Sequence, residues 1–264
     1  MARMSSATRT AVGTSIAGGA LSALSGAPHQ LSHLFRGRFP TVAVTGMTGV
    51  GKTRLADRLA RRASVESTVD VGSATMERRT RKTAKGRGFR FRVVPGDNAA
   101  TRLSALDEVF HDDPVDGVLH VVAWGHATAR RTAGTSGEAV ATREELLAAE
   151  LEDWTITAHR IASMALRRDK PVWLVIVVTK ADLFPDEVDE AVRYYSPGSG
   201  SPFAAKLDEL RSLAGGARLS VDVLPMCTEP GEATDKAARK DAGKRCSAML
   251  TALESRMGQL SGHA

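Results

Sequence analysis

Residues Thr41–Ala63 read TVAVTGMTGVGKTRLADRLARRA, and this stretch decides the fold. A short apolar strand over Thr41–Thr45 runs into a glycine-rich turn, which opens into a helix with apolar residues at helical spacing. The turn fits the pattern G-x-x-x-x-G-K-[ST] in the strand–turn–helix setting that the pattern requires. Its residues are Gly46, Met47, Thr48, Gly49, Val50, Gly51, Lys52 and Thr53.

These residue types predict a phosphate-binding loop. Glycines adopt backbone angles that side chains forbid, so successive N–H groups can turn inward toward an anion. The positive end of the following helix adds to this attraction. Lys52 is placed to reach the outer phosphates, and the Thr53 hydroxyl is placed to bind Mg²⁺. The alternative, a glycine-rich turn with a surface lysine, explains the pattern and its setting less well.

Composition is that of a globular protein. The chain has 264 residues, of which 42% are hydrophobic and 25% charged, and its net charge is +6. The basic balance permits contact with anionic surfaces without demonstrating nucleic-acid binding. Cys227 and Cys246 do not make a disulfide framework and fit a reducing compartment, so we expect a cytoplasmic protein. The longest strongly apolar run, Val172–Val178, is strand-sized.

Strands and helices alternate along the rest of the chain. This order predicts an α/β fold, a three-layer sandwich in which a mostly parallel sheet carries helices on both faces. Residues 1–38 are expected to form a flexible arm, with membrane or partner docking as the alternative, and 39–264 to form the domain. Strands are expected at Thr68–Val71, Gly88–Val94, Asp116–Trp124, Pro171–Thr179 and Arg218–Met226. Helices are expected at Thr101–Phe110, Thr142–Arg168, Phe203–Leu213 and Glu232–Leu260.

Several connecting segments are basic or rich in small residues. Ser64–Arg87 is expected to be a mobile basic loop or an edge hairpin, with a switch segment as the sharper alternative. Arg130–Gly137 and Arg193–Phe203 are expected to be loops. His111, His120 and His126 do not form a metal-ligand pattern with the cysteines, which favours structural roles.

Thr179-Lys180-Ala181-Asp182, at the end of the strongest strand, indicates the base. Ligands of open α/β sheets bind at the carboxyl ends of the strands. A carboxylate there can accept from both N1–H and the exocyclic amino group of guanine. Adenine lacks this donor pair and would leave the carboxylate without partners. The Lys180 stem can pack along the purine ring.

With these two motifs the chain resembles the P-loop GTPases of the Ras/Era type, within the TRAFAC class, from about Phe39 to Leu260. Their guanine motif is [NT]-K-x-D, which Thr179–Asp182 matches. Their final motif, usually built around Ser-Ala, contacts the base oxygen through main-chain N–H groups. Here its position is held by Met226-Cys227-Thr228, so the resemblance implies base contacts from Cys227 and Thr228. It also implies GTP or GDP as the ligand, with Mg²⁺.

The third motif of that family, D-x-x-G, is degenerate in this chain. The aligned stretch is Val93-Val94-Pro95-Gly96, so the glycine that senses the γ-phosphate is present while the carboxylate that holds Mg²⁺ through water is replaced by Val93. Asp97 takes the place of the water-orienting glutamine, where it acts on water or metal or is a turn residue. Lys52, Gly96 and Asp97 are the candidate catalytic residues. The switch threonine is open among Thr68, Thr75, Thr80 and Thr83, and an arginine finger among Arg78, Arg79, Arg81 and Arg130.

Three functions follow from these observations. The leading one is a GTP-binding switch that acts with a protein effector or regulator and hydrolyses GTP to GDP and phosphate slowly, or only when a partner stimulates it. The second is a nucleotide-binding scaffold that does not hydrolyse GTP. The third is an ATP-dependent kinase or ATPase, against which the Thr-Lys-Ala-Asp segment argues. Nucleic-acid binding through the basic segment is not favoured, because aromatic residues are not interleaved there.

Overall fold

The computed structural model describes residues 39–61, 75–82, 88–96, 99–127, 141–228 and 236–262. Residues Pro40–Ala264 form one compact unit. The expected N-terminal arm, the strand over Thr68–Val71, the loop over Arg130–Gly137 and the candidate catalytic Asp97 lie outside the described residues.

A six-stranded sheet forms the centre of this unit, in the order β2-β3-β1-β4-β5-β6. β3, β1, β4, β5 and β6 are parallel, and β2 pairs antiparallel with β3 at one edge. β1 therefore has neighbours that follow it in the chain on both sides, which makes its carboxyl end the topological switch point of the sheet. The strands are β1 (Thr41–Thr45), β2 (Glu77–Lys82), β3 (Gly88–Val93), β4 (Gly117–Val122), β5 (Val172–Val178) and β6 (Leu219–Pro225).

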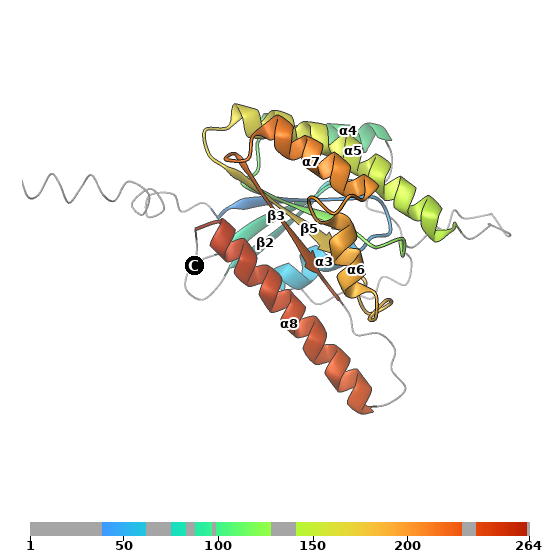
Figure 1. The fold of residues 1–264 in the computed structure, drawn as a ribbon. Helices are drawn as coiled ribbons and strands as arrows, with labels where there is room; N and C mark the ends of the chain where they lie inside the picture. Colours follow the sequence, from blue (N-terminus) through green and yellow to red (C-terminus); the bar gives the residue numbers. More distant parts are fainter. Residues whose placement is uncertain are drawn as a thin grey trace, which may run out of the picture. The chain divides into compact units, whose positions relative to one another are not determined.

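Helices cover both faces of the sheet, which confirms the expected α/β sandwich (Figure 1). One face carries α4 (Ala99–Asp107), the π-helical turn η1 (Glu108–Asp112), α5 (Arg143–Arg167) and α7 (Pro202–Ala214), packed in one hydrophobic cluster. The other face carries α3 (Lys52–Ala60) and α8 (Lys236–Leu260), which pack in a second cluster. β4 and β5 are buried along their whole length, as continuous apolar strands between two helical layers must be.

Local signals place the helix ends close to the expected positions. α5 begins with a capping box, in which the Thr142 hydroxyl accepts from Glu145 N and the Glu145 carboxylate accepts from Thr142 N. α7 begins after Ser201, whose hydroxyl accepts from Ala204 N, and Pro202 occupies its first turn.

The expected loop over Arg193–Phe203 is wrong at its beginning. α6 spans Val188–Tyr195 and buries Ala191 and Tyr195 against the cluster that contains α5 and α7. The sequence signal is weak because the helix is short and three of its other residues, Asp189, Glu190 and Arg193, are exposed. Tertiary packing of these two side chains stabilises a helix that would be marginal alone.

For residues 77–82 the structure confirms the edge hairpin, one of the two alternatives expected for the basic segment after α3, over the mobile loop. β2 pairs with β3, and three of its arginines form ion pairs with other elements. Arg78 pairs with Glu108 at 2.9 Å, Arg79 with Asp57 of α3 at 2.7 Å, and Arg81 with Glu254 of α8. These three arginines, which contributed to the expectation of a free cationic loop, are therefore paired within the fold.

The two cysteines form a disulfide between Cys227 and Cys246, which corrects the expectation of a chain without disulfides. The exit from β6 and the middle of α8, 19 residues apart in sequence, are brought together by the packing of α8 on the sheet. The argument from reduced thiols to a reducing compartment consequently no longer holds. Among the described residues, every helix is too short or too polar to cross a membrane.

Candidate functional site

The loop after β1 has the backbone of a phosphate-binding turn. Gly46, Gly49 and Gly51 have φ values of 129°, 79° and 93°, a region that side chains rarely allow. At Gly46 a Cβ atom would also collide with the main-chain oxygen of Val121 in β4. Glycine is therefore required here by the angle of the chain and by the approach of the neighbouring strand.

The N-terminus of α3 is arranged for an anion. Gly51 is the N-cap and supplies no side-chain cap, and the first turn carries no acidic residue. The first N–H groups of a helix have no partners within the helix, and the helix dipole makes this end positive. A phosphate group can satisfy these donors, as it does at other glycine-rich strand–helix turns.

Lys52 lies inside the turn that it follows. Its ammonium donates to Met47 O at 2.8 Å, and the side chain is 8% exposed. The buried ammonium is held over the loop where the outer phosphates of a nucleotide would lie.

Gly96, at the exit of β3, packs directly against this loop. A Cβ atom at Gly96 would lie 2.6 Å from Thr48 N and 2.7 Å from Lys52 Nζ. The structure thus brings Gly96 to the phosphate loop, as the sequence predicts. Any larger residue would push the loop or the lysine away.

Thr179 joins the loop to the end of β5. Its Oγ1 lies 2.6 Å from Val50 O and 2.8 Å from Val122 O, and its single hydrogen can be donated to either. Thr179 is 1% exposed, so this contact is buried. The Thr-Lys-Ala-Asp segment and the phosphate loop therefore lie side by side.

Lys180 and Asp182 follow at the same edge of the sheet. Lys180 has a left-handed backbone with φ 58°, and its ammonium donates to His126 O at 2.8 Å. Asp182 is partly exposed, and among the described residues none forms a hydrogen bond or ion pair with its carboxylate. The ammonium is tied to the loop after β4, and the carboxylate is accessible to a ligand.

Met226, Cys227 and Thr228 lie next to this segment. Met226 N donates to Val178 O at 2.8 Å, and Ala181 N donates to Met226 O at 3.2 Å. Arg58 of α3 donates through Nε to Thr228 O at 2.8 Å. The exits of β5 and β6 and the first helix are therefore connected at one edge.

Sequence reasoning missed a buried carboxyl group that holds the loop after β4. Glu150 of α5 accepts from Ala123 N at 2.8 Å and from the Tyr195 hydroxyl. Burial raises the pKa of Glu150 to about 7, against the opposing effect of these hydrogen bonds. Because the same loop carries His126 O, the acceptor for Lys180, Glu150 supports the Thr179–Asp182 segment indirectly. The available signal was an acid on the apolar stripe of α5.

A second buried acid, Asp153, anchors α4 to α5. Arg102 of α4 pairs with Asp153 at 2.5 Å, and the carboxyl group is 5% exposed. Burial raises the pKa of Asp153 to about 6, while the charges of Arg102 and Lys52 oppose that rise. α4 is the first helix after Gly96, the glycine that packs against the phosphate loop. The Arg102–Asp153 ion pair therefore holds the helix that follows this glycine.

The third motif lacks its carboxylate in structure as in sequence. Val93 is 1% exposed and packs in the cluster that contains α3 and α8. The described residues contain no group of three or more acidic, histidine or cysteine side chains that could hold a metal ion. The remaining candidate is Thr53, partly exposed in the first turn of α3. One hydroxyl fits Mg²⁺, which commonly takes only one or two protein ligands beside phosphate and water.

The other candidate residues have structural partners. His120 packs against Trp154 and Phe203, and burial lowers its pKa to about 3. His126 stacks on Phe184, and burial lowers its pKa. The candidate arginine fingers Arg78, Arg79 and Arg81 form the ion pairs described above, while Arg130 lies outside the described residues. The structural interpretation of His120 is confirmed.

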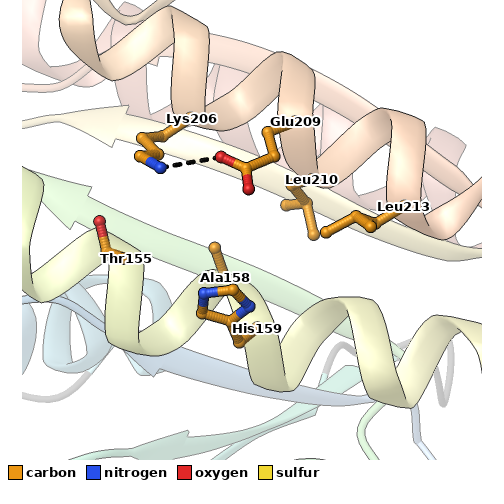
Figure 2. Close-up of a pocket in the computed structure, with 7 residues that line it drawn as sticks. All are labelled: Thr155, Ala158, His159, Lys206, Glu209, Leu210 and Leu213. Atoms are coloured by element: carbon orange, nitrogen blue, oxygen red, sulfur yellow. Dashed lines mark hydrogen bonds and ion pairs between the residues drawn. The ribbon is translucent and has the colours of Figure 1, made fainter.

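A small pocket between α5 and α7 lies apart from these residues (Figure 2). None of the candidate site residues lines it, and its charged pair, Lys206 and Glu209, is joined internally at 2.9 Å. Its lining residues are Thr155, Ala158, His159, Lys206, Glu209, Leu210 and Leu213.

Comparison with known proteins shows a distant structural likeness. No family model and no curated protein matches this sequence. A GTP-binding protein from the hyperthermophilic archaeon Sulfolobus solfataricus in complex with GDP aligns with 14% identity and a TM-score of 0.40, over 89% of this chain and 58% of its own. Two substituted variants of a protein named SsGBP align with 14% identity and TM-scores of 0.42 and 0.38. They cover 93% and 88% of this chain and 65% and 62% of their own. This chain spans less than two thirds of the length of each of the three. At these TM-scores the likeness carries no argument about function, which has to rest on the geometry described above.

Proposed function

We propose that this chain binds guanine nucleotides at the carboxyl edge of its sheet and acts as a GTPase switch of the Ras/Era type with slow or partner-stimulated hydrolysis. The contact of the Thr179 hydroxyl with Val50 O carries the proposal. It joins a loop suited to phosphate to a segment suited to guanine, so one ligand can reach both.

The base would lie between Lys180, Asp182 and the segment Met226–Thr228. The Asp182 carboxylate accepts from the two guanine donors, and the Lys180 stem packs along the ring. Main-chain N–H groups of Cys227 and Thr228 contact the base oxygen. The position of Lys180, tied to His126 O, and the accessible Asp182 support this assignment.

The phosphates would lie over Gly46–Thr53. The N–H groups of the glycine turn and the N-terminus of α3 bind their oxygens, and Lys52 neutralises charge on the outer ones. Thr53 Oγ1 would hold Mg²⁺ together with phosphate oxygens and water. Bound there, the ion neutralises charge that develops on the transferred phosphoryl group.

Slow turnover follows from the third motif. The close packing of Gly96 against Lys52 supports γ-phosphate sensing by its N–H, but Val93 stands where a carboxylate would retain Mg²⁺. Asp97 orients water or serves as a turn residue. The burial of Val93 in the apolar core favours a second candidate, a binding scaffold that does not hydrolyse GTP.

The binding proposal is tested on the natively purified full chain. Denaturation should release GDP or GTP, identified by chromatography. After its removal, calorimetric titration should show GDP binding with little ADP binding. Asp182→Ala should abolish the preference for GDP, while Asp186→Ala, the same change at an exposed aspartate nearby, should preserve it. Lys52→Ala should weaken GDP binding and Lys170→Ala should not. Equal affinity for GDP and ADP would refute guanine selection.

Hydrolysis separates the switch from the scaffold. Single-turnover release of phosphate from GTP is measured with Mg²⁺, with and without extract from the source cells. Slow release that Lys52→Ala abolishes supports a GTPase. Tight GTP binding with no phosphate release in either condition supports the scaffold.

A further inference from the structure

We propose that the Cys227–Cys246 disulfide positions the base-contacting segment Met226–Thr228, so that its reduction weakens guanine-nucleotide binding. The inference rests on the proposed function, because Met226–Thr228 is a base-contacting segment only there. It assigns to the disulfide a positioning role and makes nucleotide affinity depend on the redox state of one bond.

The location of Cys227 supports a local effect. It lies between Met226, which is hydrogen-bonded to Val178 and Ala181 at the end of β5, and Thr228, which is bonded to Arg58. The Met226 side chain is also buried in the cluster that contains α3 and α8. The disulfide is a covalent link of this segment outside the main chain, and it connects the segment to a different element, α8.

The location of Cys246 explains why the tie holds. From Ala237 to Arg245 the described side chains of α8 are exposed or partly exposed, and Cys246 is the first buried residue of the helix, at 6% exposure. Beyond it, Leu253 and Met257 pack in the core, and Arg256 pairs with Asp222 at 2.8 Å. Cys246 is thus attached to a part of α8 that is fixed on the sheet.

The chemistry is a two-electron exchange. A dithiol reductant attacks one sulfur, the S–S bond breaks, and the reductant closes to its own disulfide, leaving two protonated thiols on the protein. Glutathione disulfide reverses the step and leaves as two molecules of glutathione. The cross-link that restricts Cys227 is removed in one direction and restored in the other.

Reduction should act on the base and leave the phosphates alone. The phosphate loop is held by Thr179, Gly96 and the first turn of α3. Arg58, which links α3 to Thr228, lies in the last turn of that helix, away from its phosphate end. Loosening of Met226–Thr228 should therefore weaken GDP binding by roughly tenfold, within the usual range for coupled sites. Inorganic pyrophosphate, which lacks a base, should bind equally well in both states.

The test uses the full chain, oxidised with glutathione disulfide or reduced with dithiothreitol, with free thiols counted. Fluorescent GDP and pyrophosphate competition are measured for wild type and for Cys246→Ser, which removes the tie and keeps Cys227. The affinity for GDP should fall when wild type is reduced, and it should be low in both states of Cys246→Ser. The affinity for pyrophosphate should stay the same in all four samples. Hydrogen exchange at 226–228, measured without nucleotide, should accelerate on reduction.

Each other outcome overturns a stated part. Equal GDP affinity in the two states of wild type, with unchanged hydrogen exchange at 226–228, would overturn the positioning role while leaving guanine binding intact. Joint loss of GDP and pyrophosphate would show general loosening and overturn the local mechanism. Failure of the oxidised chain to bind GDP, with the hydrogen exchange still redox-dependent, would overturn the proposed function and the nucleotide part of this inference.

Discussion

The hydroxyl of Thr179, at the end of β5, lies 2.6 Å from the main-chain oxygen of Val50 in the loop after β1. The two residues are 129 positions apart in sequence, and both are fully buried. This contact fixes the distance between the phosphate side and the base side of the proposed site. A change at this contact itself should therefore affect both sides of the site.

Thr179→Val should reduce stability and nucleotide affinity together. Valine keeps the shape but leaves the buried Val50 oxygen without this donor, which costs about 1–3 kcal/mol of unfolding free energy. Urea unfolding and GDP titration measure the two effects. Thr179→Ser keeps the hydroxyl and is the matched control. If the valine variant retained wild-type affinity, the Thr179 contact would not set the site geometry.

Gly96→Ala should impair phosphate binding because its Cβ would lie 2.6 Å from Thr48 N and 2.7 Å from Lys52 Nζ. We expect at least roughly tenfold weaker binding of GTP, equivalent to about 1.4 kcal/mol. The control is Gly216→Ala, where the added Cβ meets no atom within 4 Å. Titration of GTP into both variants checks the prediction, and similar affinities would contradict the close packing of Gly96 on the loop.

Glu150 should make stability depend on pH. Its folded pKa of about 7 lies above the ordinary 4.5, so the folded chain keeps a proton that the unfolded chain releases between these values. The stabilisation is therefore full below about pH 4.5 and lost as the pH rises through about 7, by roughly 3 kcal/mol.

The measurement is the difference in unfolding free energy between wild type and Glu150→Gln, followed by urea from about pH 5 to 8. As the pH rises, the unfolding free energy of wild type should fall relative to that of Glu150→Gln. Contributions from groups that do not interact with Glu150 are common to both proteins and cancel, whereas Asp153, whose charge raises the pKa of Glu150, contributes to the difference. Glu152→Gln, at an exposed neighbour, is the matched control. A difference that stays constant with pH would contradict the raised pKa of Glu150.

Removing one partner of the Arg102–Asp153 ion pair should destabilise the fold more than replacing both partners with apolar residues. Arg102→Met leaves a buried carboxylate alone and should cost about 3–5 kcal/mol. The double variant Arg102→Met with Asp153→Leu should recover most of this loss, because neither charge is then buried. Urea unfolding of the two single variants and the double variant gives the coupling. Additive losses would show that the pair does not act as one buried unit.

Local patterns determined much of the fold. The Gly46–Thr53 turn was recognisable because a strand, a glycine-rich spacing and an amphipathic helix occur within a few residues of one another. The buried strands Gly117–Val122 and Val172–Val178 were evident because apolar runs of this length are typical of strands between two helical layers. The capped ends of α5 and α7 were close to expectation for the same reason, since capping depends on adjacent residues.

Long-range packing decided the rest. Cys227 follows β6 and Cys246 lies in the middle of α8, and only the docking of α8 on the sheet brings them together. Glu150 appears as one acid among several on α5, and only the fold buries it against Ala123 N and Tyr195. In sequence the arginines of β2 are typical of a free basic loop. Only the fold places Asp57, Glu108 and Glu254 next to them. Spacing along a chain reports local geometry, whereas these contacts depend on which distant surfaces the core brings together.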